Sequence, residues 1–344
     1  MTEAPRPGIG RVTAAIVAVA AMLPYLTLKI LWLAGHYVGV GAPDLMADPA
    51  MVGMNAMTFG MDAVGLVLAL AFTMRWGLRL PAWLVLLPLW VGSGLLSVVI
   101  VSAPVVLAAS GLDALDGGPI EPWVYAMVYG GFIGQGVGLM AAFALYARDR
   151  WPSVFTTRLA HPFPSLTRPL QRLIAWAALP VAVLLGGVML AGVIGAHPYL
   201  AVQNLLRGTL AIAGALALVA LVRGRGRGPF WRPAVLVWLG SGTLFAWGLY
   251  AMVVAAAAGP LSAAEGGVEE FVALFGMLTG LVMGLCAAFL LVERSGVGSG
   301  VGSGVGSGVG SGVGSGVGNV QAVQEPLEGD DRERDRGAAD QRHR

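Results

Sequence analysis

The sequence predicts an all-α protein, a polytopic transmembrane helical bundle of about eight spans, built as two parallel four-helix repeats and followed by a disordered C-terminal tail. Three observations lead to this fold class. Of 344 residues, 57% are hydrophobic and only 12% are charged, whereas a soluble domain carries roughly 25% charged residues. The apolar residues gather into eight segments of bilayer-crossing length, roughly 20 residues each. Motifs of the first half recur in the same order in the second half.

The expected spans are 12–34, 52–74, 82–108, 123–147, 174–196, 202–222, 233–258 and 270–292. The third span is long enough to tilt, or to break near Pro88 or Pro104. The sixth span is the least clear of the eight because it opens with Gln203, Asn204 and Arg207.

The arginines predict the orientation of the chain, because basic residues accumulate in cytoplasmic loops. With the N-terminus inside, fourteen arginines fall on the cytoplasmic side and the opposite loops hold no Lys or Arg. These arginines are Arg6, Arg11, Arg75, Arg79, Arg148, Arg150, Arg158, Arg168, Arg172, Arg223, Arg225, Arg227, Arg232 and Arg294. The opposite loops carry Asp44, Asp48, Asp113, Asp116, Glu121, Glu265, Glu269 and Glu270. Eight spans with both termini in the cytoplasm keep this separation intact.

Composition divides the chain into four parts. Residues 1–150 form the first four-span repeat, and 151–172 a cytoplasmic connector rich in Arg and Pro. Residues 173–294 form the second repeat, and 295–344 a linker and charged tail. Because the repeated Gly-Val-Gly-Ser of 296–318 cannot bury a core, and the last twenty residues mix both charges, we expect both to be disordered.

An internal repeat is the most specific feature of the sequence. Trp90-x-Gly92-Ser93-Gly94 of the third span returns 148 residues later as Trp238-x-Gly240-Ser241-Gly242. Leu23-Pro24 matches Leu179-Pro180, and Gly60 and Arg75 match Gly208 and Arg223. An even number of spans per repeat gives both halves the same orientation, so we expect a pseudo-two-fold axis along the membrane normal.

Small residues at every fourth position form a stripe in the fourth and eighth spans. The stripes are Gly130, Gly134 and Gly138, and Gly276, Gly280 and Gly284. Such stripes let a neighbouring helix backbone approach closely. We expect them to pack helices inside the molecule, and dimerisation through a stripe is the alternative.

Three charged residues lie inside the expected spans, where a charge costs roughly 2.5–3.5 kcal/mol. Lys29 and Asp62 differ in expected height by about 7 Å, so they are candidates for an ion pair. Alternatively, Lys29 extends to the membrane interface and Asp62 is a hydrogen-bonded structural carboxyl. Arg207 either reaches Asp62 across the halves or, as we favour, extends towards the acidic loops.

The repeat makes these charges asymmetric, since Lys29 corresponds to Leu185 and Asp62 to Leu210. We therefore expect one polar site, in the first half. Its candidate residues are Lys29, Asp62, Arg207, Asn55 and Gln135, with Tyr25, Tyr129, Gln203 and Asn204 as further lining. Hydrogen bonding between helices is the alternative use of the uncharged ones.

Motifs for catalysis are missing. The single cysteine, Cys286, excludes a disulfide within the chain and argues against a cysteine metal site. There is no His-Glu-x-x-His, P-loop or dinucleotide fingerprint. Glu269-Glu270 is reminiscent of membrane CAAX-type proteases, but Leu274 stands where they have an arginine. We expect no catalytic residues, no cofactor, no metal and no nucleic-acid partner.

Pro24-Tyr25 through Lys29, Trp32 and Gly35, together with the Trp-x-Gly-Ser-Gly strings, resembles a family of uncharacterised multi-pass integral membrane proteins of actinobacteria. The predominance of Arg over Lys fits a high-GC genome of that kind. The resemblance covers the eight-span region and implies a location in the plasma membrane of a bacterium. It implies no activity and no functional residues.

Three functions remain open. We favour a non-catalytic membrane scaffold or sensor that, besides the lipid bilayer, contacts a cytoplasmic protein or anionic lipid through residues 148–172. The alternative is a small-solute or proton-coupled permease, with Asp62 titrating and Lys29 or Arg207 as its counter-charge. An intramembrane enzyme is the third. The sequence leaves the oligomeric state open.

Overall fold

The computed structural model describes residues 8–111, 120–160, 165, 167–224, 228–257 and 267–296, and these residues form helices joined by short turns. The helices are α1 (Ile9–Leu33), α2 (Pro43–Ala47), α3 (Pro49–Thr73), α4 (Ala82–Ser110), α5 (Pro122–Arg150), α6 (Pro152–Thr156), α7 (Arg168–Ala191), α8 (Pro198–Arg223), α9 (Trp231–Ala257), α10 (Gly267–Gly296) and the 3-10 helix η1 (Arg75–Leu78). The expected tail from residue 297, and the loop charges Arg6, Asp113, Asp116, Arg225, Arg227 and Glu265, lie outside the described residues.

Eight of these helices confirm the predicted spans: α1, α3, α4, α5, α7, α8, α9 and α10. Each has 24 to 30 residues and is apolar enough to cross a membrane. At 1.5 Å per residue even the shortest is about 36 Å long, more than the roughly 30 Å of a bilayer core. Pro88 and Pro104 lie inside an unbroken α4, so the third span is one helix. The chain is a multi-pass integral membrane protein.

The surface of the bundle is as apolar as its interior, as lipid contact requires. Only 28–50% of each span's most apolar window is buried, and large side chains such as Leu184 and Phe289 are exposed. Exposed tryptophans lie at helix ends: Trp83 at the start of α4 and Trp123 at the start of α5. Tryptophan at both ends of the spans is typical of the two membrane–water interfaces.

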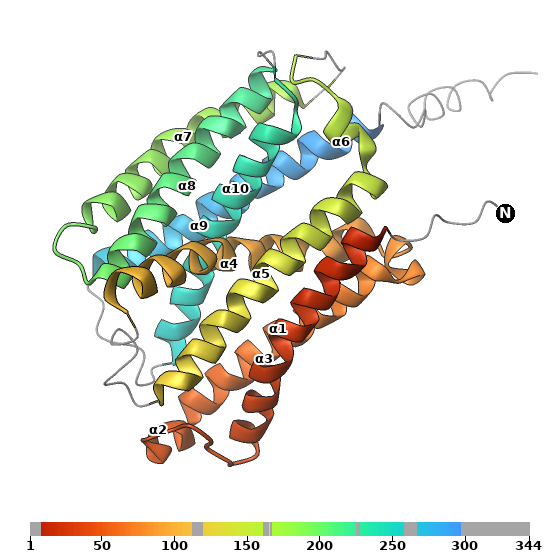
Figure 1. The fold of residues 1–344 in the computed structure, drawn as a ribbon. Coiled ribbons are helices and arrows are strands. Elements are labelled where there is room, and N and C mark those ends of the chain that lie inside the picture. Colours follow the sequence, from red (N-terminus) through yellow and green to blue (C-terminus); the bar gives the residue numbers. More distant parts are fainter. Residues whose placement is uncertain are drawn as a thin grey trace, which may run out of the picture. The chain divides into compact units, whose positions relative to one another are not determined.

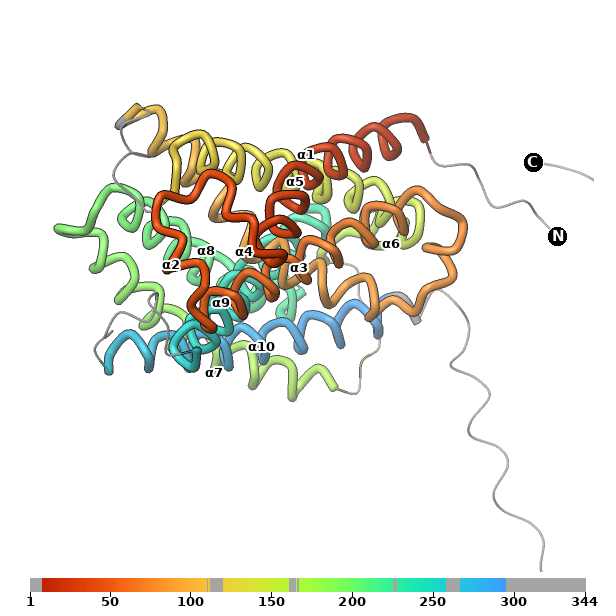
Figure 2. Tube along the Cα trace, turned by 90° about the horizontal axis from the view of Figure 1, so that it is seen from below, coloured from red at the N-terminus to blue at the C-terminus, as the bar shows by residue number. Residues whose placement is uncertain are grey.

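The helices of the two halves pack in corresponding pairs. In the first half α1 packs on α3 and α5, and α4 packs on α5; in the second, α7 packs on α8 and α10, and α9 packs on α10. Helices α1 and α5 lie side by side in both views, on the side of the bundle away from α7 and α10 (Figures 1 and 2). The halves meet mainly where α4 crosses α9 and approaches α8 (Figure 1).

The glycine stripe of α5 packs inside the first half. A Cβ at Gly138 would lie 2.7 Å from the backbone nitrogen of Ala18 on α1, and a Cβ at Gly134 would lie 2.7 Å from the Ala21 Cβ. Since real Cβ atoms do not approach other atoms this closely, these two positions require glycine. Gly130 differs, because a Cβ there meets nothing within 4 Å.

The stripe of α10 makes different contacts. Gly280 lies against the α9 backbone at Phe245, whereas Gly284 faces the first half, where its Cβ would lie 2.6 Å from Trp90 Cζ2. Gly276 is in ordinary contact only, 3.6 Å from the Leu244 carbonyl oxygen. The two stripes therefore pack against different neighbours despite their similar sequences.

The two halves differ most in how α3 and its counterpart α8 are held. A Cβ at Gly208 of α8 would lie 2.7 Å from the Gly186 oxygen of α7, and Gly214 lies against Gly240 of α9. In α3 a Cβ at Gly60, the position equivalent to Gly208, meets nothing within 4 Å. Backbone contact thus clamps α8 on two sides, and α3 lacks the equivalent contact at Gly60.

Candidate functional site

The structure brings four of the five predicted site residues together on three helices of the first half. Lys29 of α1, Asn55 and Asp62 of α3, and Gln135 of α5 are all buried, each 4–7% exposed. We call these four residues the α3 polar site, because each of its hydrogen bonds joins α3 to a neighbour. Arg207 lies elsewhere.

Lys29 is held by an amide and two aromatic rings. Its Nζ donates a hydrogen bond to Asn55 Oδ1 at 2.5 Å, and lies 4.9 Å from the centre of the Tyr25 ring and 5.3 Å from that of Trp32. Residues three and four apart share one helix face, so α1 itself builds this aromatic wall. Ring faces attract a cation, most strongly where water is excluded. The ammonium is therefore stabilised without a carboxylate in contact.

Asp62 is only half satisfied. Its Oδ1 accepts a hydrogen bond from Gln135 Nε2 at 3.0 Å, and its Oδ2 is buried without a hydrogen-bond partner in the described part of the chain. The two charges of the site are within electrostatic range of each other, but the described residues contain no Lys29–Asp62 ion pair. The direct pair considered from the sequence is replaced by two separate hydrogen bonds.

Helix boundaries explain the difference. Because α3 begins at Pro49 and α1 ends at Leu33, Lys29 lies about 6 Å and Asn55 about 9 Å from their shared end of the bundle, and Asp62 about 20 Å. The amide is therefore level with the ammonium, and the carboxyl lies about two turns deeper.

Asn55 also ties α3 to the loop that precedes it. Its Nδ2 contacts Met46 Sδ at 3.6 Å, and Met46 lies on the short helix α2, where it is 2% exposed. Asp48 caps the start of α3 by accepting hydrogen bonds from the backbone nitrogens of Ala50 and Met51. This end of α3 is thus well formed as a helix, and it is attached to α1 by apolar packing of Met51 against Leu28 and Trp32 together with the Asn55 amide.

Two tyrosines of the second half lie near Tyr25 and Tyr129, and neither was predicted from the sequence. Tyr199 of α8 meets Tyr129 of α5 with ring centres 6.1 Å apart. Tyr250 of α9 and Tyr129 lie near Tyr25, which in turn lies near Asp62. No charge marks Tyr250 in its apolar segment, so only the packing of the halves reveals it.

Arg207 belongs to the second half. Its guanidinium carbon lies 4.9 Å from the centre of the Trp247 ring, and both residues line a small cavity together with Met189 and Gly276. Within the described residues no ion pair joins Arg207 to Asp62. The site therefore has one cation, Lys29, and one carboxyl, Asp62.

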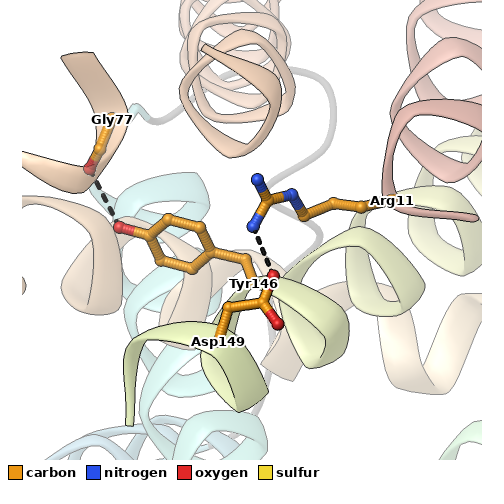
Figure 3. A network of polar contacts seen from close by, with 4 residues as sticks. All are labelled: Arg11, Gly77, Tyr146 and Asp149. Atoms are coloured by element: carbon orange, nitrogen blue, oxygen red, sulfur yellow. Dashed lines mark hydrogen bonds and ion pairs between the residues drawn. The ribbon is translucent and has the colours of Figure 1, made fainter. Parts of the chain in front are cut away.

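At the end of the bundle where α1, α4, α7 and α9 begin, here called the amino-terminal face, a second polar network holds the turn between α3 and α4. Arg11, 5% exposed, donates to Asp149 Oδ2 at 2.8 Å, and the Tyr146 hydroxyl donates to the Gly77 carbonyl at 2.9 Å (Figure 3). Arg150 donates to the Leu80 carbonyl at 2.5 Å. This end of α3 is anchored to α5.

The connector is docked on the last helix at the same face. Glu293 of α10 accepts three hydrogen bonds: from Ser165 at 2.6 Å, from Thr167 at 2.5 Å and from Gln171 at 3.0 Å. The Arg294 side chain donates to the Leu159 carbonyl. The start of α7 and the end of α10, from which the tail continues, are thus joined by one carboxylate.

The α3 polar site can hold a proton or accept a hydrogen bond at the open oxygen of Asp62, and its ammonium can change partner only by leaving Asn55. No group of three His, Cys, Asp or Glu able to hold a metal ion occurs among the described residues. Comparison of the chain with models of protein families, with curated proteins and with solved structures finds no match.

Proposed function

We propose that this membrane protein is a non-catalytic sensor, in which a fixed frame of helices carries one helix, α3, whose position depends on the α3 polar site. The observation behind the proposal is the contrast between equivalent helices. Glycine–backbone contacts clamp α8 on both sides. Helix α3 is joined to its neighbours through Lys29–Asn55 and Asp62–Gln135 hydrogen bonds.

Polar tethers suit a responsive element because they are weak and have competitors. A hydrogen bond between membrane helices averages about 0.6 kcal/mol, and one to a charged group such as the Lys29 ammonium contributes about 1.5–3 kcal/mol, so the two together supply about 2–4 kcal/mol. A proton on Asp62, or a small polar ligand that displaces either partner, changes the balance by a comparable amount. A shift of this size is enough to change the populations of two nearly equal conformations.

The anchored turn sets the direction of movement. Tyr146 and Arg150 hold the chain at Gly77 and Leu80, so the free part of α3 is the portion that contains Asn55 and Asp62. We infer a hinge near the amino-terminal face, with the opposite end of α3 moving against α1 and α5.

The output lies on the amino-terminal face, which we place in the cytoplasm of a bacterium, with the protein in the plasma membrane. The support for this orientation is the arginine distribution, with Arg148, Arg150, Arg158, Arg168 and Arg172 at the end of α5 and along the connector. Such residues attract anionic lipid or an acidic partner protein. Exchanging Arg158 and Arg172 for Gln should lower the amount of phosphatidylglycerol that copurifies, and unchanged lipid would leave a cytoplasmic protein as the partner.

Hydrogen exchange of the protein in lipid nanodiscs tests the central claim. Amides of α3 between residues 53 and 68 should exchange faster than those of α8 between 201 and 216, because local opening of α3 breaks fewer close contacts. Gln135→Ala should accelerate α3 exchange about threefold, the equivalent of one interhelical hydrogen bond, and Asn55→Ala should accelerate it more, because it removes a hydrogen bond to a charged group.

Asn204→Ala is the matched control. Asn204 of α8 donates to the Gly192 carbonyl at the end of α7 at 3.3 Å, so the same amide is removed from a helix that glycine contacts already clamp. Exchange in α8 should stay unchanged. Equal protection of α3 and α8 in the unmodified protein would refute the sensor mechanism.

A proton-coupled permease is the second candidate, favoured by the open Oδ2 of Asp62. In liposomes with an imposed membrane potential and an internal pH dye, a permease would take up protons faster than empty liposomes do. Asp62→Asn would abolish that uptake while the amount of protein in the liposomes stays the same. Uptake no faster than in empty liposomes would rule this candidate out.

A further inference from the structure

The repeated Trp-x-Gly-Ser-Gly strings meet each other where α4 crosses α9. Trp90 Nε1 donates to Ser241 Oγ at 3.0 Å, and Trp238 Nε1 donates to Ser93 Oγ at 2.8 Å. Each serine hydroxyl also donates to the backbone carbonyl of the tryptophan in its own string, Ser93 at 3.2 Å and Ser241 at 3.4 Å. These four hydrogen bonds thus form two pairs that are related by the sequence offset of 148.

The backbones touch at the centre of this pattern. A Cβ at Gly242 would lie 2.8 Å from the Trp90 carbonyl oxygen, and a Cβ at Gly94 would collide with the Gly242 carbonyl group. By contrast, a Cβ at Gly92, in the same string, meets nothing within 4 Å. We call this contact the seam: Trp90, Ser93 and Gly94 of α4 with Trp238, Ser241 and Gly242 of α9.

We propose that the seam is an isologous interface between two copies of the same four-span unit. The α4 face of the first copy binds the equivalent α9 face of the second copy, and the connector joins the two copies in one chain. In such an interface residue i of one unit contacts residue j of the other, and j contacts i. Trp90–Ser241 and Trp238–Ser93 satisfy that condition under the sequence offset of 148. The axis passes between Gly94 and Gly242.

The places where the units differ lie beside this pattern. Thr243, equivalent to Leu95, donates to the Gly94 carbonyl at 3.2 Å, and Phe245, equivalent to Ser97, stacks on Trp90 with ring centres 4.8 Å apart. These contacts have no counterpart across the axis, so the joined units have diverged around a shared centre. We therefore expect contacts at the seam, and not the covalent connector, to hold the halves together.

Double-mutant cycles in the full chain, unfolded by detergent titration, test the symmetry. The pairs W90F with S241A and W238F with S93A should show equal coupling, about threefold in the unfolding equilibrium constant, the worth of one interhelical hydrogen bond. The pairs W90F with S93A and W238F with S241A, each within one helix, should be additive because the serine contacts only a backbone carbonyl there. Coupling in one cross-helix pair alone, or within a helix, would overturn the proposal.

A protease site inserted between residues 161 and 164 of the full chain gives a second measurement that does not depend on unfolding. After cleavage in mild detergent the two halves should remain together through size-exclusion chromatography. Gly94→Val should let the cleaved halves separate, and Gly92→Val should not. Halves that separate without any substitution would show that the connector, not the seam, joins them.

Discussion

Replacement of Asn55 by Leu is the sharpest test of how the Lys29 charge is stabilised. The substitution removes the hydrogen bond to Nζ, which is 2.5 Å long, and leaves a buried ammonium with only the Tyr25 and Trp32 rings. A hydrogen bond to a charged group contributes about 1.5–3 kcal/mol, and the remaining ring contacts do not replace it. We expect Asn55→Leu to lower the free energy of unfolding by about 2 kcal/mol.

Lys29→Leu should be much milder. It puts the residue of the second half, Leu185, at the equivalent position and removes the charge together with its need for a partner. Replacing a buried polar pair by apolar residues is often neutral, so we expect a change of less than about 1 kcal/mol. In the double variant Lys29→Leu with Asn55→Leu the charge is gone, so the free energy of unfolding should fall by only as much as in Lys29→Leu alone. The two substitutions should therefore be coupled by roughly 1–2 kcal/mol.

Unfolding by detergent titration in mixed micelles, followed by circular dichroism, measures these differences. Asn204→Leu provides the control, since its amide bonds a carbonyl and no charge, and about 0.6 kcal/mol is expected from one interhelical hydrogen bond. The reasoning fails if Asn55→Leu is no more harmful than Asn204→Leu, or if removing Lys29 does not relieve it.

Further predictions concern the glycine contacts of α8 and the polar contacts at the amino-terminal face. Gly208→Val should destabilise the protein by about 2 kcal/mol or more through overpacking, whereas Gly60→Val should change stability by less than about 0.5 kcal/mol; thermal unfolding of the two variants decides. Tyr146→Phe removes the hydroxyl bound to the α3–α4 turn and should increase hydrogen exchange in residues 74–80 without affecting α8. Glu293→Ala removes the acceptor of three hydrogen bonds and should speed trypsin cleavage in the connector. Deletion of residues 297–344 should leave the unfolding midpoint of the spans unchanged, because the Gly-Val-Gly-Ser repeat and the mixed charges of that segment cannot bury a core.

The sequence was sufficient to predict the spans because a lipid environment leaves the backbone few alternatives. Every polar backbone group has to be satisfied inside the segment, so a long apolar stretch is a helix. Even the third span, with Pro88 and Pro104, follows this rule and stays continuous. The polar residues on α1, α3 and α5 were expected to hydrogen-bond between helices, since a charged or amide side chain in lipid needs a partner on a neighbouring helix, whereas Arg207 lies apart from them.

The pairing within the site could not be predicted, because it depends on small differences in helix boundaries. The hydropathy of the sequence places the start of the second span at residue 52, but α3 begins at Pro49. Three residues of helix add about 4.5 Å to the depth of Asp62, which moves the carboxyl away from Lys29, whereas Asn55 stays within about 3 Å of the height of Lys29. Apolar composition does not contain that information, because Pro49 and Ala50 fit a loop as well as a helix.

The different attachment of α3 and α8 was also beyond the sequence. Gly60 and Gly208 stand at equivalent positions of similar segments, and only the packing shows that one faces open space and the other a carbonyl at 2.7 Å. A small residue permits close approach but does not cause it. Tyr250 is a similar case, since a phenol in an apolar helix becomes part of a polar site only through what the other half places beside it.

Close glycine contacts occur on α8 of the second half, and the buried charges occur beside α3 of the first half. Two helices in backbone contact leave no room for charged side chains between them, so one position cannot have both. At the position equivalent to Asp62, the second half has Leu210, whose carbonyl group lies against Gly240 of α9. So close an approach leaves no space for a hydrated or movable polar group, and backbone packing holds α8 without one. In the first half the equivalent glycine of α4, Gly92, makes no such contact, and the polar side chains of Lys29, Asp62 and Gln135 lie between α3 and its neighbours α1 and α5. Under the proposed sensor mechanism, a helix held in this way responds to a proton or a ligand, and its counterpart α8 supports it. The polar site and the looseness of α3 are therefore one property, and a substitution that closes α3 onto its neighbours should remove both together.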